Sequence, residues 1–154
     1  MIAERLLGPS SSREMWLFDV FSGMPQPGAE DPPEAWQDVG KFVSSETIVR
    51  ETFARARVAT ERIHFVVGRY EDTLPGFRSP SIAFLHVDCD WYASVRLCLR
   101  TFYHAVVPGG VVVFDDYGHW SGCRRAVDEF IAERRIEISL KPIDYTSHYF
   151  FKPQ

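Results

Sequence analysis

The sequence has few cysteines, no basic tract and no long apolar run, and each shortage excludes a class of protein. Its 3 cysteines show no CxxC spacing, and an odd number without an export signal indicates reduced thiols and a cytoplasmic location. The net charge is -4 and no basic tract stands out, so neither nucleic acid nor an anionic membrane is expected as a partner. The longest apolar runs are far too short to span a bilayer.

What the sequence does contain is the composition of a globular protein. Hydrophobic residues make up 45% and aromatic residues 14% of the 154 residues, which excludes a disordered chain. A chain of this length can bury one core. We therefore expect a single domain over residues 1–154.

Two continuous apolar runs, residues 82–87 and 111–114, are bounded by Pro or Gly and are typical of strands buried on both faces of a parallel sheet. Each run leads directly into carboxylates. Ligands of open α/β sheets bind beyond the carboxyl ends of such strands, so these acids predict a site. Converging carboxylates repel one another unless they are protonated or bind a hard cation such as Mg²⁺, Mn²⁺ or Ca²⁺. The acids are Asp88, Asp90, Asp115 and Asp116.

Each group of acids also has a simpler interpretation. Asp90 precedes a helical pattern and could be the N-cap of that helix. Asp115 and Asp116 could be a solvated pair in a turn, where Asp is common. Their occurrence at two neighbouring strand ends favours the site for the pair, whereas both roles stay open for Asp90.

The rest of the chain alternates between the two periodicities that distinguish strands from helices. Strand–helix alternation predicts an α/β fold with a mostly parallel sheet, and two final strands close in sequence predict an antiparallel edge at the C-terminal end. Besides the two runs above, strands are expected at residues 15–18, 62–67, 136–140 and 147–152. Helices are expected from residue 44 or 45 to about 59, at 91–107 and at 123–134, and residues 1–7 could be the end of another helix. A short turn or helix is expected at 71–75 and a turn at 108–110.

Residues 25–40 contain 4 prolines and 2 glycines, and we expect a long surface loop there. Long loops in compact domains are either functional lids or flexible connections. Trp36 and Phe42 supply apolar anchors, which favours a lid slightly.

Four segments of the chain carry a resemblance to a known family. They are residues 18–25 (FDVFSGMP), 67–75 (VGRYEDTLP), 85–94 (LHVDCDWYAS) and 109–128, which includes DDYG and CRRAVD. Each segment is modestly specific alone, and together they span most of the chain in the right order. The sequence resembles the macrocin O-methyltransferase (TylF) family of Rossmann-like, S-adenosylmethionine-dependent methyltransferases.

The resemblance implies methylation of a sugar hydroxyl of a small-molecule, natural-product or glycan-like substrate, with S-adenosylmethionine and a divalent metal, usually Mg²⁺, as cofactors. It implies a class I methyltransferase sheet and leaves open whether the protein forms a homo-oligomer. By the matching motifs, the metal ligands would be Asp88, Asp115 and Asp116, and the cofactor contacts would be Asp19, Ser22, Gly68 and Asp88.

The sequence departs from the family pattern in two places. A strand and glycine-rich loop that hold the methionine part of the cofactor belong before Asp19, and only 18 residues precede it. We therefore expect a partial, N-terminally truncated domain that lacks the first strand and this loop; the alternative is a catalytically inactive methyltransferase-like domain with a binding role or none. The second departure is that residues 23–42 contain no histidine to act as base, so His119 is the candidate, although it could equally be a loop histidine against solvent or Trp120.

Overall fold

The computed structural model describes residues 7, 11–58, 60–78 and 80–154. The chain divides into two compact units, one made of Met1–Pro25 and Gly40–Thr73, the other of Gln26–Val39 and Leu74–Gln154. A single domain over the whole chain therefore stays a prediction. The expected helix end at residues 1–7 lies, apart from Leu7, outside the described residues, as does Ala59.

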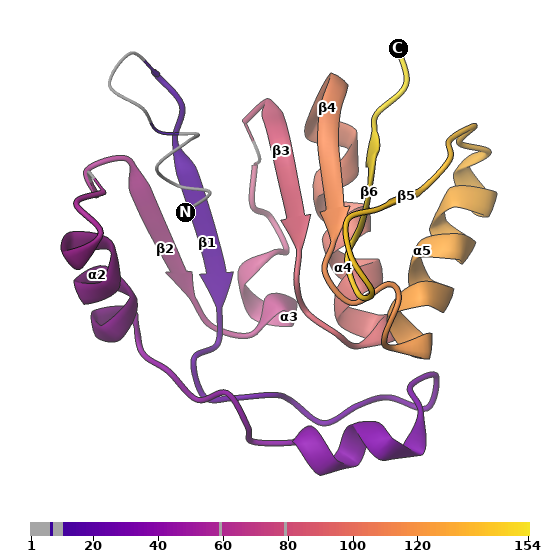
Figure 1. Ribbon diagram of the computed structural model, residues 1–154, viewed down its shortest axis with the longest axis horizontal. Helices are drawn as coiled ribbons and strands as arrows, with labels where there is room; N and C mark the ends of the chain where they lie inside the picture. The colour runs from indigo at the N-terminus through magenta and orange to yellow at the C-terminus, as the bar shows by residue number, and fades with distance from the viewer. Residues whose placement is uncertain (1–6, 8–10, 59, 79) are drawn as a thin grey trace. The chain divides into compact units, whose positions relative to one another are not determined.

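The first unit is built on two parallel strands. Strand β1 (Met15–Asp19) pairs with β2 (Ile63–Val67), with Leu17 opposite Phe65 (Figure 1). Because side chains alternate along a strand, one face of this pair carries the apolar residues that pack against helix α2 (Glu46–Arg55). The resulting core contains Leu7, Phe53, Val58 and Ile63, with Met15, Leu17, Val49 and Phe65 partly buried around it.

Helix α2 is shorter than its sequence pattern predicts. The side chain of Ser45 accepts a hydrogen bond from the N–H of Ile48 (3.2 Å), which confirms a serine at the start of the helix. The helix ends at Arg55, and Arg57 adopts a left-handed conformation (φ 55°) that cannot continue it. Val58 falls within the helix that we expected to reach about residue 59, but it packs in the core from beyond the helix end.

The second unit contains a four-stranded sheet in the order β3-β4-β6-β5. Strand β3 (Ile82–Val87) is parallel to β4 (Val106–Phe114), whereas β6 (His148–Phe151) is antiparallel to β4 and to β5 (Lys141–Pro142). Figure 1 shows these strands side by side, with the C-terminal strand next to β4. The α/β class, the parallel pairing and the antiparallel C-terminal edge are therefore confirmed.

Two long helices complete this unit, α4 (Tyr92–Phe102) and α5 (Ser121–Arg134), and short helices occur at α3 (Tyr70–Thr73, in the first unit), η1 (Pro33–Asp38) and η2 (Tyr103–Ala105). Each long helix buries one apolar face, made of Val95, Leu99 and Phe102 in α4 and of Ala126, Val127 and Phe130 in α5. Two further residues that we assigned to these faces from their helical spacing differ: Val106 is buried in β4, and Ile131 of α5 is only partly buried. Full burial of a Val, Leu or Phe side chain contributes about 1.5–3 kcal/mol to stability.

Three local predictions are wrong. The helix expected to reach residue 107 ends at Phe102, and β4 begins already at Val106 and runs through the turn expected at 108–110, where Gly109 has φ 75°. A register shift opposite β3 accommodates this irregular start. Residues 136–140 alternate between partly buried and exposed side chains as expected, but they pair with no strand, and pairing begins only at Lys141.

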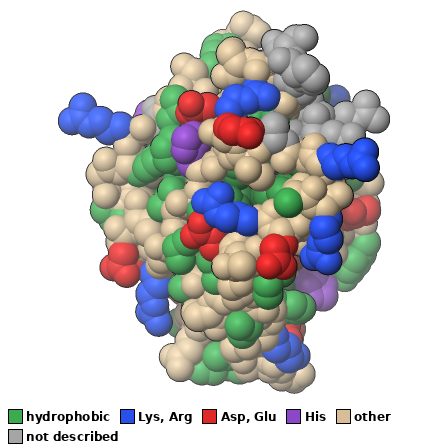
Figure 2. All heavy atoms as spheres, turned by 90° about the vertical axis from the view of Figure 1, so that its left-hand side faces the viewer, with side chains coloured by type: hydrophobic (Ala, Val, Ile, Leu, Met, Phe, Trp, Pro, Cys, Tyr) green, Lys and Arg blue, Asp and Glu red, His purple; other side chains and the backbone are tan. Residues whose placement is uncertain are grey.

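Charged side chains are mixed on the face of the molecule shown in Figure 2. Among the described residues drawn there, Lys and Arg side chains are interspersed with Asp and Glu and with apolar side chains. Across the described residues, no helix is both long and apolar enough to cross a bilayer.

Candidate functional site

The carboxylates that follow β3 and β4 meet at one edge of the four-stranded sheet. Asp88, Asp90 and Asp116 each offer one ligand atom, and these atoms lie within 4.8 Å of one another. The main-chain N–H of Asp115 donates to the carbonyl of Val87 (3.0 Å), so the two parallel strand ends stay aligned to the last residue. We call Asp88, Asp90 and Asp116 the acid trio. It contains two of the three predicted metal ligands, and Asp90 in place of Asp115.

Asp90 takes its place in the trio through an unusual backbone conformation. Its φ is 57°, in the left-handed region that Asp tolerates better than most residues, and Trp91 N–H reaches the carbonyl of Cys89 (2.6 Å) around it. The indole N–H of Trp120 donates to Asp90 Oδ1 (3.2 Å). Trp91, not Asp90, is the N-cap residue of α4, so the capping role that we considered for Asp90 is wrong.

The trio concentrates negative charge in a partly buried place. Burial, and after it the neighbouring carboxylates of Asp116 and Asp88, raise the pKa of Asp90 to about 7. Burial, followed by Asp88 and Asp115, raises the pKa of Asp116 to about 6. A set of carboxylate oxygens that is costly to ionise without a counter-charge is the donor set that hard divalent cations prefer, so the residues present fit Mg²⁺, Mn²⁺ or Ca²⁺.

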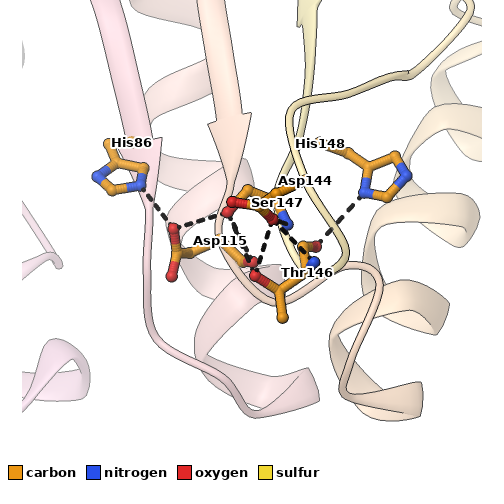
Figure 3. A network of polar contacts seen from close by, with 6 residues as sticks. All are labelled: His86, Asp115, Asp144, Thr146, Ser147 and His148. Atoms are coloured by element: carbon orange, nitrogen blue, oxygen red, sulfur yellow. Dashed lines mark hydrogen bonds and ion pairs between the residues drawn. The ribbon is translucent and has the colours of Figure 1, made fainter.

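Asp115, the third predicted metal ligand, lies in a different network (Figure 3). Its Oδ1 atom lies 3.3 Å from Nε2 of His86 and 3.1 Å from the hydroxyl of Ser147. Asp115 still belongs to the same electrostatic environment, because its charge contributes to the raised pKa values of Asp90 and Asp116. Its role as a metal ligand stays a prediction.

His119, the predicted base, is exposed at the rim of this cluster. Its ring meets the Trp120 ring edge-on, with centroids 4.5 Å apart, and the Tyr145 ring lies 6.1 Å away. The contact with Trp120 is the one we considered as the simpler interpretation of this histidine. His119 is also close enough to the trio for its charge to lower the pKa of Asp116.

The predicted cofactor residues Asp19 and Gly68 lie together in the first unit. Gly68 N–H donates to the carbonyl of Asp19 (3.0 Å), and Asp19 Oδ1 accepts from the N–H of Phe21 (2.6 Å). Gly68 has φ 147°, and a Cβ there would stand 2.9 Å from Thr73 Cγ2, so the position requires glycine. Ser22, the third predicted contact, lies in an exposed bend shortly after Asp19. Asp88, the fourth predicted contact, belongs to the second unit.

Sequence reasoning missed two residues that shape the site, Asp31 and Ser147. Asp31 Oδ1 accepts from the N–H of Tyr92 (2.8 Å), so it caps α4 from 61 positions earlier in the chain. A local sequence pattern cannot predict a helix cap from a residue so distant in the chain. Ser147 was read only as the start of the last strand, and its hydroxyl gave no signal.

Solved structures that resemble this one have the fold of O-methyltransferases. The structure of the O-methyltransferase NovP matches with a TM-score of 0.84 and 30% identity, covering 94% of this chain and 62% of that one. The calicheamicin methyltransferase CalS11 matches with a TM-score of 0.76 and 22% identity, covering 97% and 65% of the two chains, and shows the fold alone.

The family follows from the sequence comparison. The model of the TylF, macrocin-O-methyltransferase, family matches residues 6–152, and this chain belongs to that family. Demethyldecarbamoylnovobiocin O-methyltransferase of Streptomyces niveus is 34% identical over 143 residues, which cover 90% of this chain and 55% of that protein. Mycinamicin III 3''-O-methyltransferase of Micromonospora griseorubida is 27% identical over 145 residues, covering 90% and 57%. The chain therefore spans about half the length of the curated relatives it matches.

Proposed function

We propose that this chain carries the cation-binding and acceptor-activating part of an O-methyltransferase that transfers a methyl group from S-adenosylmethionine to a sugar hydroxyl of a natural product. The family and its relatives, which include a demethyldecarbamoylnovobiocin O-methyltransferase and a mycinamicin III 3''-O-methyltransferase, support the reaction class. The observation that carries the proposal in this chain is the acid trio, whose oxygens lie within 4.8 Å of one another at a sheet edge.

The trio would hold a divalent cation with Asp88, Asp90 and Asp116, and the predicted ligand Asp115 lies next to it. When bound, such a cation lowers the pKa of a coordinated hydroxyl and turns it into a better nucleophile. The protein contributes the position of the carboxylates and partial exclusion of water, which strengthens their electrostatic interactions.

Two residues are candidates for the base that takes the proton lost by the acceptor hydroxyl. His119 is the residue predicted from the sequence, and it lies at the exposed rim of the site. Asp90 is the second candidate, as an alternative to its role as a cation ligand, because its carboxylate lies beside Asp88 and Asp116 and is oriented by the hydrogen bond from Trp120. Steady-state kinetics of variants at His119 and at Asp90 distinguish the two candidates. Replacement of the base lowers kcat much more than it changes acceptor affinity.

The cofactor part of the proposal rests on the first unit. Asp19 stands at the end of a parallel strand, where an acid can accept hydrogen bonds from ribose hydroxyls. Its Oδ1 is engaged by Phe21, so Oδ2 is the atom that we assign to the ribose. Gly68 and Ser22 would approach the same cofactor. We further propose that the protein is cytoplasmic and that its substrate is a small molecule that contains a sugar.

The first test is calorimetric titration of the chain with S-adenosylhomocysteine and, separately, with Mn²⁺. We expect Mn²⁺ to bind, with at least tenfold weaker binding in Asp116→Asn and in Asp88→Asn. Asp72→Asn, which changes an exposed acid of α3 in the first unit, is the matched control and should bind Mn²⁺ as the unchanged chain does. Equal Mn²⁺ affinity in all four proteins would contradict a cation site at the trio, and absence of S-adenosylhomocysteine binding would contradict the cofactor part for this chain.

A further inference from the structure

Ser147 is a buried polar residue whose hydroxyl is directed at Asp115. Only 7% of the residue is exposed, and its Oγ atom lies 3.1 Å from Asp115 Oδ1 and 3.2 Å from the carbonyl oxygen of the same residue. A carbonyl and an ionised carboxylate only accept hydrogen bonds, so the serine hydroxyl is the donor in this contact. A buried hydroxyl without such a partner would be costly, which ties Ser147 to Asp115.

The turn that carries Ser147 is itself fixed. Asp144 Oδ1 accepts from the N–H groups of Thr146 (2.9 Å) and Ser147 (2.7 Å), and the carbonyl of Ser147 accepts from the N–H of Ile143 (2.8 Å). Figure 3 shows Asp144, Thr146 and Ser147 close together beside Asp115. The serine hydroxyl is therefore presented to Asp115 by a rigid turn.

His86 holds Asp115 from the other side. It lies on β3, and Ser147 immediately precedes β6, so the two donors come from the strands on either side of β4. The His86 ring and the Ser147 hydroxyl both contact the same oxygen, Oδ1 of Asp115. For His86 to donate this hydrogen bond, Nε2 of its ring carries the proton. The carboxylate of Asp115 is thus held along the sheet edge, while the next side chain, that of Asp116, joins the trio.

We infer that Ser147 is a positioning residue of the cation site: together with His86 it fixes the carboxylate of Asp115, the predicted ligand that lies beside the trio. This inference rests on the proposed function. It concerns residues that support the ligands rather than bind the cation. Loss of such an outer partner typically weakens metal binding about 10- to 100-fold.

The test is Mn²⁺ affinity, measured from the electron paramagnetic resonance signal of free Mn²⁺ during titration of the purified chain. We expect Ser147→Ala to weaken binding about tenfold and Ser147→Thr, which keeps the hydroxyl, to restore affinity to within about threefold. Ser121→Ala, which removes an exposed hydroxyl at the start of α5, is the matched control and should not change affinity.

A double-mutant cycle separates positioning from a general loss of structure. If Ser147 acts through Asp115, then Ser147→Ala causes no further loss of affinity once Asp115→Ala is present, because the oxygen that accepts from Ser147 is gone. Additive losses would overturn the inference, as would unchanged Mn²⁺ affinity in Ser147→Ala. If Ser147→Ala fails to fold by circular dichroism, the same cycle with His86→Ala, and with His86→Gln as the variant that keeps an N–H donor, decides the question.

The outcome also separates this inference from the proposed function. Failure of the unchanged chain to bind Mn²⁺ would remove the cation site, and the positioning role with it. Binding by the unchanged chain, with equal binding by the Ser147 and His86 variants, would leave the cation site in place and overturn the positioning role alone.

Discussion

The carboxylate of Asp31 accepts a hydrogen bond from the main-chain N–H of Tyr92 at 2.8 Å, and this contact ties residues 26–39 to the start of helix α4. The other oxygen of Asp31 accepts from the N–H of Gly28 (2.8 Å), so the loop is fixed on its own side as well. The first N–H groups of a helix have no partner within it, and an acid there also interacts favourably with the helix dipole. The loop is therefore anchored beside Asp90 and Trp91, which immediately precede α4.

Replacement of Asp31 by Ala should release this anchor. We expect a loss of about 1 kcal/mol in the free energy of unfolding, the usual cost of removing a helix cap, and faster hydrogen exchange at the amide of Tyr92. Asp31→Asn keeps the accepting oxygen and should lose less. Urea unfolding and exchange monitored by NMR are the measurements. Glu34→Ala in the same loop is the control, and an equal effect of both alanine variants would contradict the anchoring role.

Gly122 should tolerate no side chain while Asp31 stays in place. A Cβ at Gly122, in the first turn of α5, would overlap Oδ1 of Asp31. We expect Gly122→Ala to destabilise the chain by about 1–3 kcal/mol, as overpacking does. In an Asp31→Ala background the same change should cost much less, because the atom it meets is gone. Equal costs in both backgrounds, measured by urea unfolding, would show that the two residues do not meet in solution.

The sequence was sufficient to find the two strands that end at the acids, because continuous apolar runs bounded by Pro or Gly have few other uses. It could not tell Asp115 from Asp116. Asp116 joins Asp88 and Asp90, whereas the carboxylate of Asp115 contacts His86 and Ser147. The residues that Asp115 contacts lie 29 and 32 positions away in the chain.

The alternation at residues 136–140 misled for a related reason. Alternation reports which side chains face the core, and Ile136, Ile138 and Leu140 are indeed more buried than Glu137 and Ser139. A strand also needs a partner with free main-chain groups, and β5 pairs only through Lys141 and Pro142 with the start of β6. The alternation of these five residues reports their burial and does not report whether a partner strand lies beside them.

Stability should depend on pH through the acid trio. The pKa of Asp90 rises from 3.8 to about 7 and that of Asp116 to about 6, so between about pH 4 and pH 7 the folded chain binds more protons than the unfolded chain. The contribution of these groups is therefore most favourable below pH 4 and is lost as the pH rises through 7. In EDTA, Asp90→Asn should raise the free energy of unfolding by about 1–2 kcal/mol at pH 8 and change it little at pH 4. Urea unfolding of both proteins at the two pH values gives the answer, and a variant less stable than the parent at pH 8 would contradict the charge repulsion.

A divalent cation should reverse the same pH dependence. The cation binds carboxylates and competes with the protons that they hold, so its affinity for the trio should rise with pH between about 5 and 8. Binding to the folded chain alone raises stability by RT ln(1 + [L]/Kd), which amounts to about 2.7 kcal/mol at a concentration 100 times Kd. We therefore expect Mg²⁺ or Mn²⁺ to raise the Tm by several degrees at pH 8, by much less at pH 5, and EDTA to cancel the gain. Asp116→Asn should abolish most of the increase and Asp72→Asn none of it, because Asp72 lies on α3, outside the trio. A rise in Tm that is the same in both variants would place the cation elsewhere on the chain.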